Sequence, residues 1–307
     1  MRFQPRLWKL IVPLLVAGAV AGVTLYYFHA RTASTAADLV SFLPASNATI
    51  VYVDVGAIRR AGIVNMLAGS KAAEELEYRQ FVDETKFDYR QDLDTVALAF
   101  KDSQVFLAAR GRFHWKNLTD YAMHQGGSCH NKYCVMPGSR PDRRISFYSV
   151  SADLLGMAVS SDDFAAYQVT RQSGKLNLQP PHQPVWALVP IGALQAPGVL
   201  PAGAKPYISA LQKADQALFT IGLENNRLQL GLDVTCRDAA SAATLLTNFQ
   251  NTTDTLRKWI AREHSQANPA DLSGVLVGGT FRRDDRLVYG QWPIPEPFVK
   301  AITDGGF

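Results

Sequence analysis

Apolar and polar positions follow different patterns before and after about residue 30. Residues 10–28 contain no charged side chain, and in a helix they would span roughly 28 Å, close to the hydrocarbon thickness of a bilayer. Trp8 before this stretch and Tyr27 near its end are typical of interfacial anchors. The pattern predicts one transmembrane helix over residues 10–28.

The charges on either side of this stretch predict its orientation. Arg2, Arg6 and Lys9 precede it, whereas Arg31 alone follows it closely. The positive-inside rule then places the N-terminus in the cytoplasm and the C-terminal domain in the periplasm, with the inner membrane as the site of anchoring. The lipid bilayer is therefore an expected partner through the predicted helix. A signal peptide cleaved near residues 33–37 is the alternative, although its apolar region would normally be shorter.

After residue 41, the alternation of apolar and polar positions is typical of strands joined by tight turns. Hairpins imply antiparallel pairing, so the pattern favours an α+β fold over a doubly wound parallel sheet. The predicted hairpins pair 95–100 with 105–110, 145–150 with 156–160, 217–223 with 228–235, and 274–281 with 287–292. Helices are predicted over 115–124, 164–172 and 238–263.

The two halves of this region share a local pattern. Residues 53–62 (VDVGAIRRAG) align with 189–198 (VPIGALQAPG), and each copy is followed by a hairpin, a helix and a second hairpin. A proline-rich segment over 174–183 interrupts both periodicities and marks the boundary between the halves. The predicted fold class is an N-terminal transmembrane helix followed by two similar α+β repeats with mainly antiparallel sheets. The predicted organisation is a cytoplasmic basic flank (1–9), the transmembrane helix (10–28), a linker (29–41), the first repeat (42–176), the second repeat (184–298) and a C-terminal tail (299–307).

Three short motifs carry a resemblance to a known group of proteins. They are LPA at 43–45, VYVDV at 51–55 with Arg59 shortly after it, and VFLAARGRF at 105–113. Together with the N-terminal anchor, this pattern resembles a family of uncharacterised bacterial envelope proteins over most of residues 42–295. The resemblance implies an exported, duplicated α+β domain, and it implies no catalytic residues.

Charge and composition narrow the function classes. The formal net charge is +4, and the N-terminal 31 residues supply it, because the rest of the chain carries 27 acidic residues and as many basic ones. A neutral body without a stripe of Lys and Arg argues against nucleic-acid binding, where phosphate neutralisation dominates the affinity. Three Cys in 307 residues exclude a disulfide-dense scaffold.

Catalytic and cofactor motifs are missing from the sequence. It contains no GxxxxGK[ST], GxSxG, HExxH or GxGxxG pattern, so neither an enzyme nor a cofactor is predicted. An enzyme would require groups distant in the sequence to converge, for example His124 or His130 near Asp54. The structural alternative for Asp54 is a cap on the turn that follows its strand.

Residues 123–134 (MHQGGSCHNKYC) form a polar, Gly-rich segment that is predicted to be a loop. In an oxidising compartment Cys129 and Cys134 close a small disulfide, and this disulfide is the prediction. A Zn or Cu site made of His124, Cys129, His130 and Cys134 is an alternative, but the spacing matches no common metal motif. Two free thiols are the third alternative.

Two other features allow a structural and a functional interpretation. Cys236 ends an apolar strand, so a buried small side chain is predicted rather than a nucleophile. The helix over 238–263 places Phe249, Leu256 and Trp259 at helical spacings. Core packing against the sheet is predicted for it, and a groove for a partner is the alternative.

These features predict a single-span, membrane-anchored protein with a non-enzymatic periplasmic domain. It would serve as an interaction or scaffold subunit of a cell-envelope assembly, with a protein partner in the envelope. The alternative function is a periplasmic module that binds a small ligand between the two repeats, near residues 174–184, because domain interfaces are common pocket sites.

Overall fold

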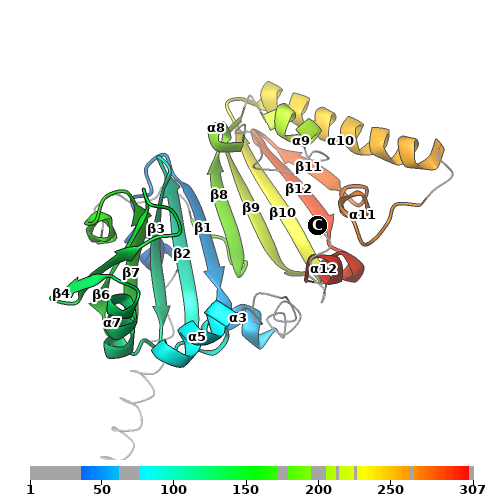
Figure 1. Cartoon of the computed structure of the whole chain (residues 1–307). Coiled ribbons are helices and arrows are strands. Elements are labelled where there is room, and N and C mark those ends of the chain that lie inside the picture. The colour runs from blue at the N-terminus through cyan, green and yellow to red at the C-terminus, as the bar shows by residue number, and fades with distance from the viewer. Residues whose placement is uncertain are drawn as a thin grey trace, which may run out of the picture.

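Twelve strands form one continuous antiparallel sheet (Figure 1). The structure is a computed structural model, and it describes residues 36–61, 76–171, 179–194, 205–211, 214–224, 227–262 and 266–303. The strand order is β11-β12-β10-β9-β8-β1-β2-β3-β7-β6-β5-β4. The strands are β1 (Thr49–Asp54), β2 (Leu93–Lys101), β3 (Gln104–Gly111), β4 (Ser128–His130), β5 (Tyr133–Pro137), β6 (Arg144–Ser151), β7 (Leu154–Ser160), β8 (Val185–Pro190), β9 (Ala214–Glu224), β10 (Arg227–Cys236), β11 (Thr280–Asp284) and β12 (Leu287–Pro293).

A seam between β1 and β8 joins the two halves of the sheet. Ile50 pairs with Leu188 in antiparallel register, and Tyr52 stacks on Trp186 with ring centroids 5.5 Å apart. The predicted fold class is therefore wrong. The strands of both halves belong to one sheet, and its layout does not divide into two clear repeats. Local periodicity identified the strands, but it carries no information on which strands pair across a long stretch of chain.

The predicted transmembrane anchor also needs correction. Residues 10–28 lie outside the described residues, and within the described ranges no helix is both long and apolar enough to cross a membrane. The longest of these helices, α10 (Ala239–Arg262), has 24 residues but buries only one side. The predicted single-pass location in the inner membrane, with a periplasmic C-terminal domain, is therefore not supported.

Short helices surround the sheet at its ends and faces. The linker predicted over 29–41 contains α2, whose Leu39 and Val40 are buried. The helices other than α10 are α2 (Ala36–Val40), α3 (Val55–Arg60), α5 (Leu76–Thr85), α6 (Tyr89–Asp92), α7 (Trp115–His124), the 3-10 helix η2 (Ala165–Gln168), α8 (Ile191–Leu194), α9 (Lys205–Ala210), α11 (Leu272–Leu276) and α12 (Glu296–Thr303).

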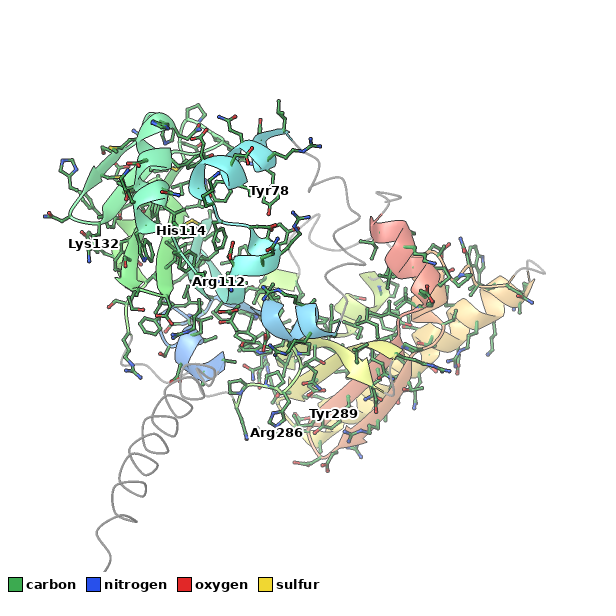
Figure 2. All side chains as sticks on the ribbon, turned by 90° about the horizontal axis from the view of Figure 1, so that it is seen from below. Tyr78, Arg112, His114, Lys132, Arg286 and Tyr289 are labelled. Atoms are coloured by element: carbon green, nitrogen blue, oxygen red, sulfur yellow. A yellow bond between two sulfur atoms is a disulfide. The ribbon has the colours of Figure 1, made fainter. Side chains whose placement is uncertain are left out.

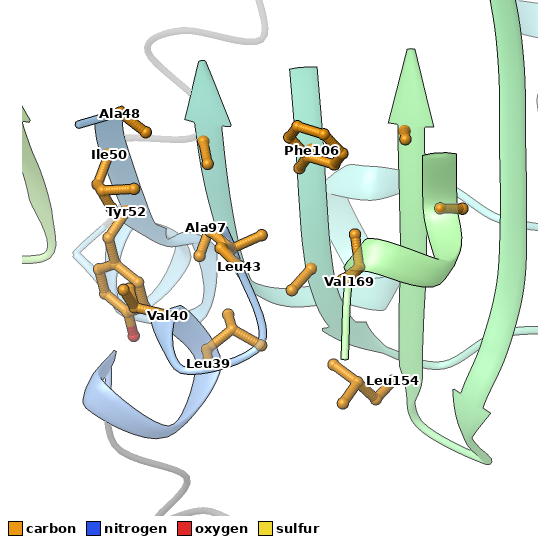
Figure 3. Packing of buried hydrophobic residues seen from close by; sticks show 14 of the residues in the cluster. Leu39, Val40, Leu43, Ala48, Ile50, Tyr52, Ala97, Phe106, Leu154 and Val169 are labelled. Atoms are coloured by element: carbon orange, nitrogen blue, oxygen red, sulfur yellow. The ribbon is translucent and has the colours of Figure 1, made fainter. Parts of the chain in front are cut away.

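One core lies where α2 and η2 cover the first half of the sheet. Leu39 and Val40 pack there with Ile50 of β1 and Phe106 of β3, and Val169 closes the cluster after η2 (Figure 3). Each of these five side chains is at most 2% exposed. The burial of so many aliphatic groups, at about 25 cal/mol per Å² of apolar surface, explains why the segment around α2 folds onto the sheet.

A second core lies under α10 on the opposite face of the sheet. Leu188 belongs to the core beneath α2, whereas its neighbour Val189 belongs to the core beneath α10. Successive residues of a strand point to opposite faces, so β8 contributes to both cores. In the second core Phe249 of α10 is fully buried near Val234 of β10 and Val288 of β12.

Most predicted hairpins and helices are confirmed. The helix predicted over 115–124 is α7, the helix predicted over 238–263 is α10, and the first three hairpins are β2–β3, β6–β7 and β9–β10. The fourth prediction is partly wrong, because residues 272–276 are helix α11 and the strand begins only at Thr280. The helix predicted over 164–172 is reduced to the single turn η2.

Candidate functional site: the groove between α9 and α10

The position of α10 follows from its sequence. Asp238 precedes the helix, and its Oδ1 accepts a hydrogen bond of 2.6 Å from the Ser241 amide, which caps the N-terminus. The buried residues of α10 recur at helical spacings and form one stripe toward the sheet. They are Ala242, Leu245, Phe249, Thr253 and Ile260.

Tyr207 holds α9 against α10 (Figure 1). Its side chain is 7% exposed, and its hydroxyl shares a 2.6 Å hydrogen bond with the hydroxyl of Thr253, which is 1% exposed. The Tyr207 ring also lies 5.7 Å from the Phe249 ring and 6.0 Å, edge to face, from the Trp292 ring. Burial raises the pKa of Tyr207, although the hydrogen bond with Thr253 acts in the opposite direction. The hydroxyl therefore stays protonated, and this joint fixes the spacing of the two helices.

A groove of about 670 Å³ opens between α9 and α10. One wall comes from α9, and the other is a stripe of α10 residues that recur every three or four positions and include two adjacent pairs, so they lie along one side of the helix. The lining residues are Pro206, Tyr207, Ser209, Ala210, Asn248, Asn251, Thr252, Thr255, Leu256 and Trp259.

Among the residues whose side chains the structure describes, no charged side chain lines the groove. None of these lining residues is Asp, Glu, Lys, Arg or His, and α10 has no charged residue from position 239 to 253. Asn248, Asn251, Thr252 and Thr255 form no side-chain hydrogen bond with other residues that the structure describes. Because amides and hydroxyls both donate and accept, this wall offers free donors and acceptors without a net charge.

Trp259 forms the apolar end of the groove. Its side chain is 56% exposed, although Ile260 beside it is buried. The core packing predicted for this helix is confirmed for Phe249, which is fully buried, but it is wrong for Trp259. Neighbouring helical residues point about 100° apart, so Trp259 and Ile260 cannot both face the core. An exposed indole next to amide side chains offers a ligand an apolar ring beside hydrogen-bonding groups.

A smaller pocket of about 210 Å³ adjoins the groove. The two share Ser209, Ala210 and Asn248, and the smaller one reaches Cys236 at the end of β10. The predicted burial of Cys236 is confirmed, since it is 1% exposed. Burial raises the pKa of this thiol, and Asp215 and Asp238 raise it further. The thiol is therefore held in its protonated, weakly nucleophilic form.

The predicted disulfide is present between Cys129 and Cys134. The segment predicted as a loop is instead the hairpin β4–β5, in which these two residues are direct cross-strand partners with Cα atoms 4.1 Å apart. Asn131 and Lys132 form the two-residue turn with φ angles of 48° and 69°, as a type I′ hairpin requires. Figure 2 shows Lys132 at the outer tip of this hairpin.

The alternative metal site does not form around this hairpin. The disulfide leaves Cys129 and Cys134 without thiolates for a metal ion. His130 is exposed on β4, and Nδ1 of His124 lies 3.5 Å from Oε2 of Glu84. Among the residues that the structure describes, no group of three His, Cys, Asp or Glu side chains could hold a metal ion.

Asp54 has the structural role that the sequence suggested as an alternative. Its Oδ1 accepts a 2.6 Å hydrogen bond from the Ala57 amide and caps α3. His124 contacts Glu84 instead of Asp54. The convergence that an enzyme would need between Asp54 and this histidine is therefore not present.

A charged network near α5 and α6 is a second cluster that sequence reasoning missed. The Tyr78 hydroxyl donates a 2.9 Å hydrogen bond to Asp88, and Arg90 donates to both oxygens of the same carboxylate. Burial raises the pKa of Asp88, but the Arg90 and Tyr78 hydrogen bonds outweigh it and lower the pKa overall. Figure 2 shows Tyr78 on the first half of the molecule. Every member of this cluster is paired within it, so it ties α5 to α6.

Comparisons with known proteins give little further information. The sequence matches no model of a known protein family, and it matches no curated protein. Solved structures of TP0453 are similar at a distance. Crystal form I has a TM-score of 0.44 and 10% identity over 88% of this chain and 98% of that chain. Crystal form III has a TM-score of 0.45 and 9% identity over 87% of this chain and 98% of that chain. At this level of similarity the likeness carries no inference about function.

Proposed function

We propose that this chain is a non-catalytic binding protein whose ligand occupies the groove between α9 and α10. The observation that carries the proposal is a groove wall on α10 made of amide and hydroxyl side chains that ends in the exposed indole of Trp259. Within the described part of the chain, these amides and hydroxyls have no hydrogen-bond partner and no charged neighbour in the lining. The groove has no paired nucleophile and base among its described lining residues, and the hydroxyl of Ser209 donates to the carbonyl of Pro206. Binding rather than reaction is the chemistry that this lining supports.

The size of the groove favours a small ligand or a segment of a larger one. Small-molecule sites usually enclose about 300–1,000 Å³, and the groove falls within that range at about 670 Å³. A stable protein interface would instead bury about 800 Å² per partner over a broad surface. The scaffold role and the envelope partner expected from the sequence stay predictions. The ligand site predicted from the sequence lay near 174–184, whereas the site proposed here is the groove between α9 and α10.

Two neighbouring positions on α10 provide a matched test. Asn251 and Gln250 are both exposed amides, but only Asn251 lines the groove. The full chain is incubated with a small-molecule extract of its source cells, separated by gel filtration, and examined by mass spectrometry for a retained compound. We expect retention by the wild type and by Gln250→Trp, and loss in Asn251→Trp, because the larger side chain fills the groove. Equal retention by all three proteins, or retention by none, would overturn the proposal.

A further inference from the structure

We infer that the ligand of the groove is an uncharged saccharide that stacks on Trp259 and hydrogen-bonds the amides and hydroxyls of α10. This inference rests on the proposed binding function and names the chemical class of the ligand. A sugar ring has an apolar face of C–H groups and a rim of hydroxyls. The groove offers the matching pair of surfaces, namely an exposed indole and a row of uncharged polar side chains.

The polar groups suit hydroxyls better than ions. A sugar hydroxyl both donates and accepts, and so do the amides of Asn248 and Asn251 and the hydroxyls of Thr252 and Thr255. An anionic or cationic ligand would lose part of its hydration against a wall whose described side chains carry no opposite charge, which costs free energy. The groove therefore favours neutral saccharides over charged ones.

The arrangement along the helix favours a chain of sugars over a single ring. The stripe runs from Asn248 to Trp259, and at 1.5 Å per residue these positions span about 16 Å along α10. Trp259 stands at one end, and the amides follow it toward the other. A monosaccharide on the indole would leave Asn248 out of reach, whereas an oligosaccharide can contact both ends.

Competing ligand classes fit the groove less well. An acyl chain would match the apolar part of the lining, but it would leave the amides and hydroxyls of Asn248, Asn251 and Thr252 without partners. An anionic group is usually held by Arg or Lys, and the described lining contains neither. A peptide that docks as an amphipathic helix needs a row of apolar contacts, and on α10 the exposed groove wall offers only Leu256 and Trp259.

Binding to defined glycans tests this inference. The full chain is applied to an array of neutral oligosaccharides of glucose, mannose and N-acetylglucosamine, beside sulfated and uronic-acid oligomers. The affinity for the neutral oligosaccharides that bind is then measured by titration calorimetry. We expect binding to at least one neutral oligomer, weak dependence on salt, and weaker binding of the corresponding monosaccharide.

Variants on the exposed helix face give the expected pattern without disturbing the core. Trp259→Ala should lower the affinity about two- to tenfold, as the loss of one aromatic contact predicts, and Trp259→Phe should retain part of it. Asn251→Ala should also weaken binding, whereas Gln250→Ala on the neighbouring exposed position should leave it unchanged.

The outcomes separate this inference from the proposed function. Binding to charged glycans alone, or neutral binding that is indifferent to Trp259→Ala, would overturn the saccharide assignment. If no glycan binds but Asn251→Trp abolishes retention of another compound from the extract, the groove is a binding site and the saccharide class is wrong. If neither experiment detects a ligand, both proposals fail.

Discussion

The hydrogen bond between Tyr207 and Thr253 gives the sharpest test of how the groove is built. Both hydroxyls are buried and 2.6 Å apart, so each satisfies the other. Tyr207→Phe removes one hydroxyl and leaves that of Thr253, a residue that is 1% exposed, without this partner. An unsatisfied buried hydroxyl costs about 1–3 kcal/mol, so this variant should lose that much of its free energy of unfolding.

The double variant makes the reasoning specific. Thr253→Val alone should also destabilise, because it leaves the Tyr207 hydroxyl unpaired in the same buried place. When Tyr207→Phe and Thr253→Val are combined, both polar groups are gone and the apolar shapes remain. The loss should then fall short of the sum of the two single losses by about 1 kcal/mol or more.

Urea unfolding of the full chain, followed by circular dichroism, measures these differences. Tyr167→Phe is the matched control, because Tyr167 is 53% exposed and its hydroxyl has no hydrogen-bond partner among the described residues. The control should change stability by less than about 0.5 kcal/mol. Strictly additive losses in the double variant, or single variants as stable as the control, would refute the role assigned to this joint.

Three other perturbations follow from the structure. Reduction of the Cys129–Cys134 disulfide removes a constraint on a short loop of the unfolded chain, so it should lower the free energy of unfolding by about 2 kcal/mol. Equal urea midpoints with and without a reductant would contradict this. Asp54→Ala removes the N-terminal cap of α3 and should lower the free energy of unfolding by about 1 kcal/mol. Asp54→Asn keeps a hydrogen-bond acceptor and should lower it less. If thermal unfolding shows Asp54→Asn to be the less stable variant, Asp54 does not act as this cap. For Asp233, burial raises the pKa more than Arg282 lowers it, so the folded state holds the proton more tightly and stability falls as the pH rises through and above the usual aspartate range. Asp233→Asn should therefore be more stable than the wild type at neutral pH and lose this advantage in acid, and a destabilised variant at neutral pH would show that Arg282 outweighs burial.

Features that depend on neighbouring residues could be predicted from the sequence. The helix α7 and the hairpin β2–β3 have the predicted places, because each is defined by a short pattern and a polar turn. The disulfide belongs to the same class, since Cys129 and Cys134 face each other across a two-residue turn. The helix α11 was missed, although Asp271 before it caps the amides of Ser273 and Gly274 and was a readable signal.

Features that depend on distant contacts could not be predicted. The α9 wall of the groove is a six-residue helix whose place depends on Tyr207 meeting Thr253, and no local pattern encodes that contact. To predict that Trp259 is exposed, one would have to know that Ile260 takes the core position beside it. One available signal was the uncharged stretch from 239 to 253, since a helix on the surface normally carries ionic side chains.

The seam between β1 and β8 has a consequence for how the chain is made. β1 is synthesised early, but the backbone groups on one of its edges can form their hydrogen bonds only with β8, which leaves the ribosome much later. Until then Ile50 and Tyr52 belong to an unpaired edge that another nascent chain could extend. If the two halves are expressed from separate genes, β1 and β8 each keep an unpaired edge. Each fragment should therefore aggregate when it is expressed alone, and co-expression should keep both in solution.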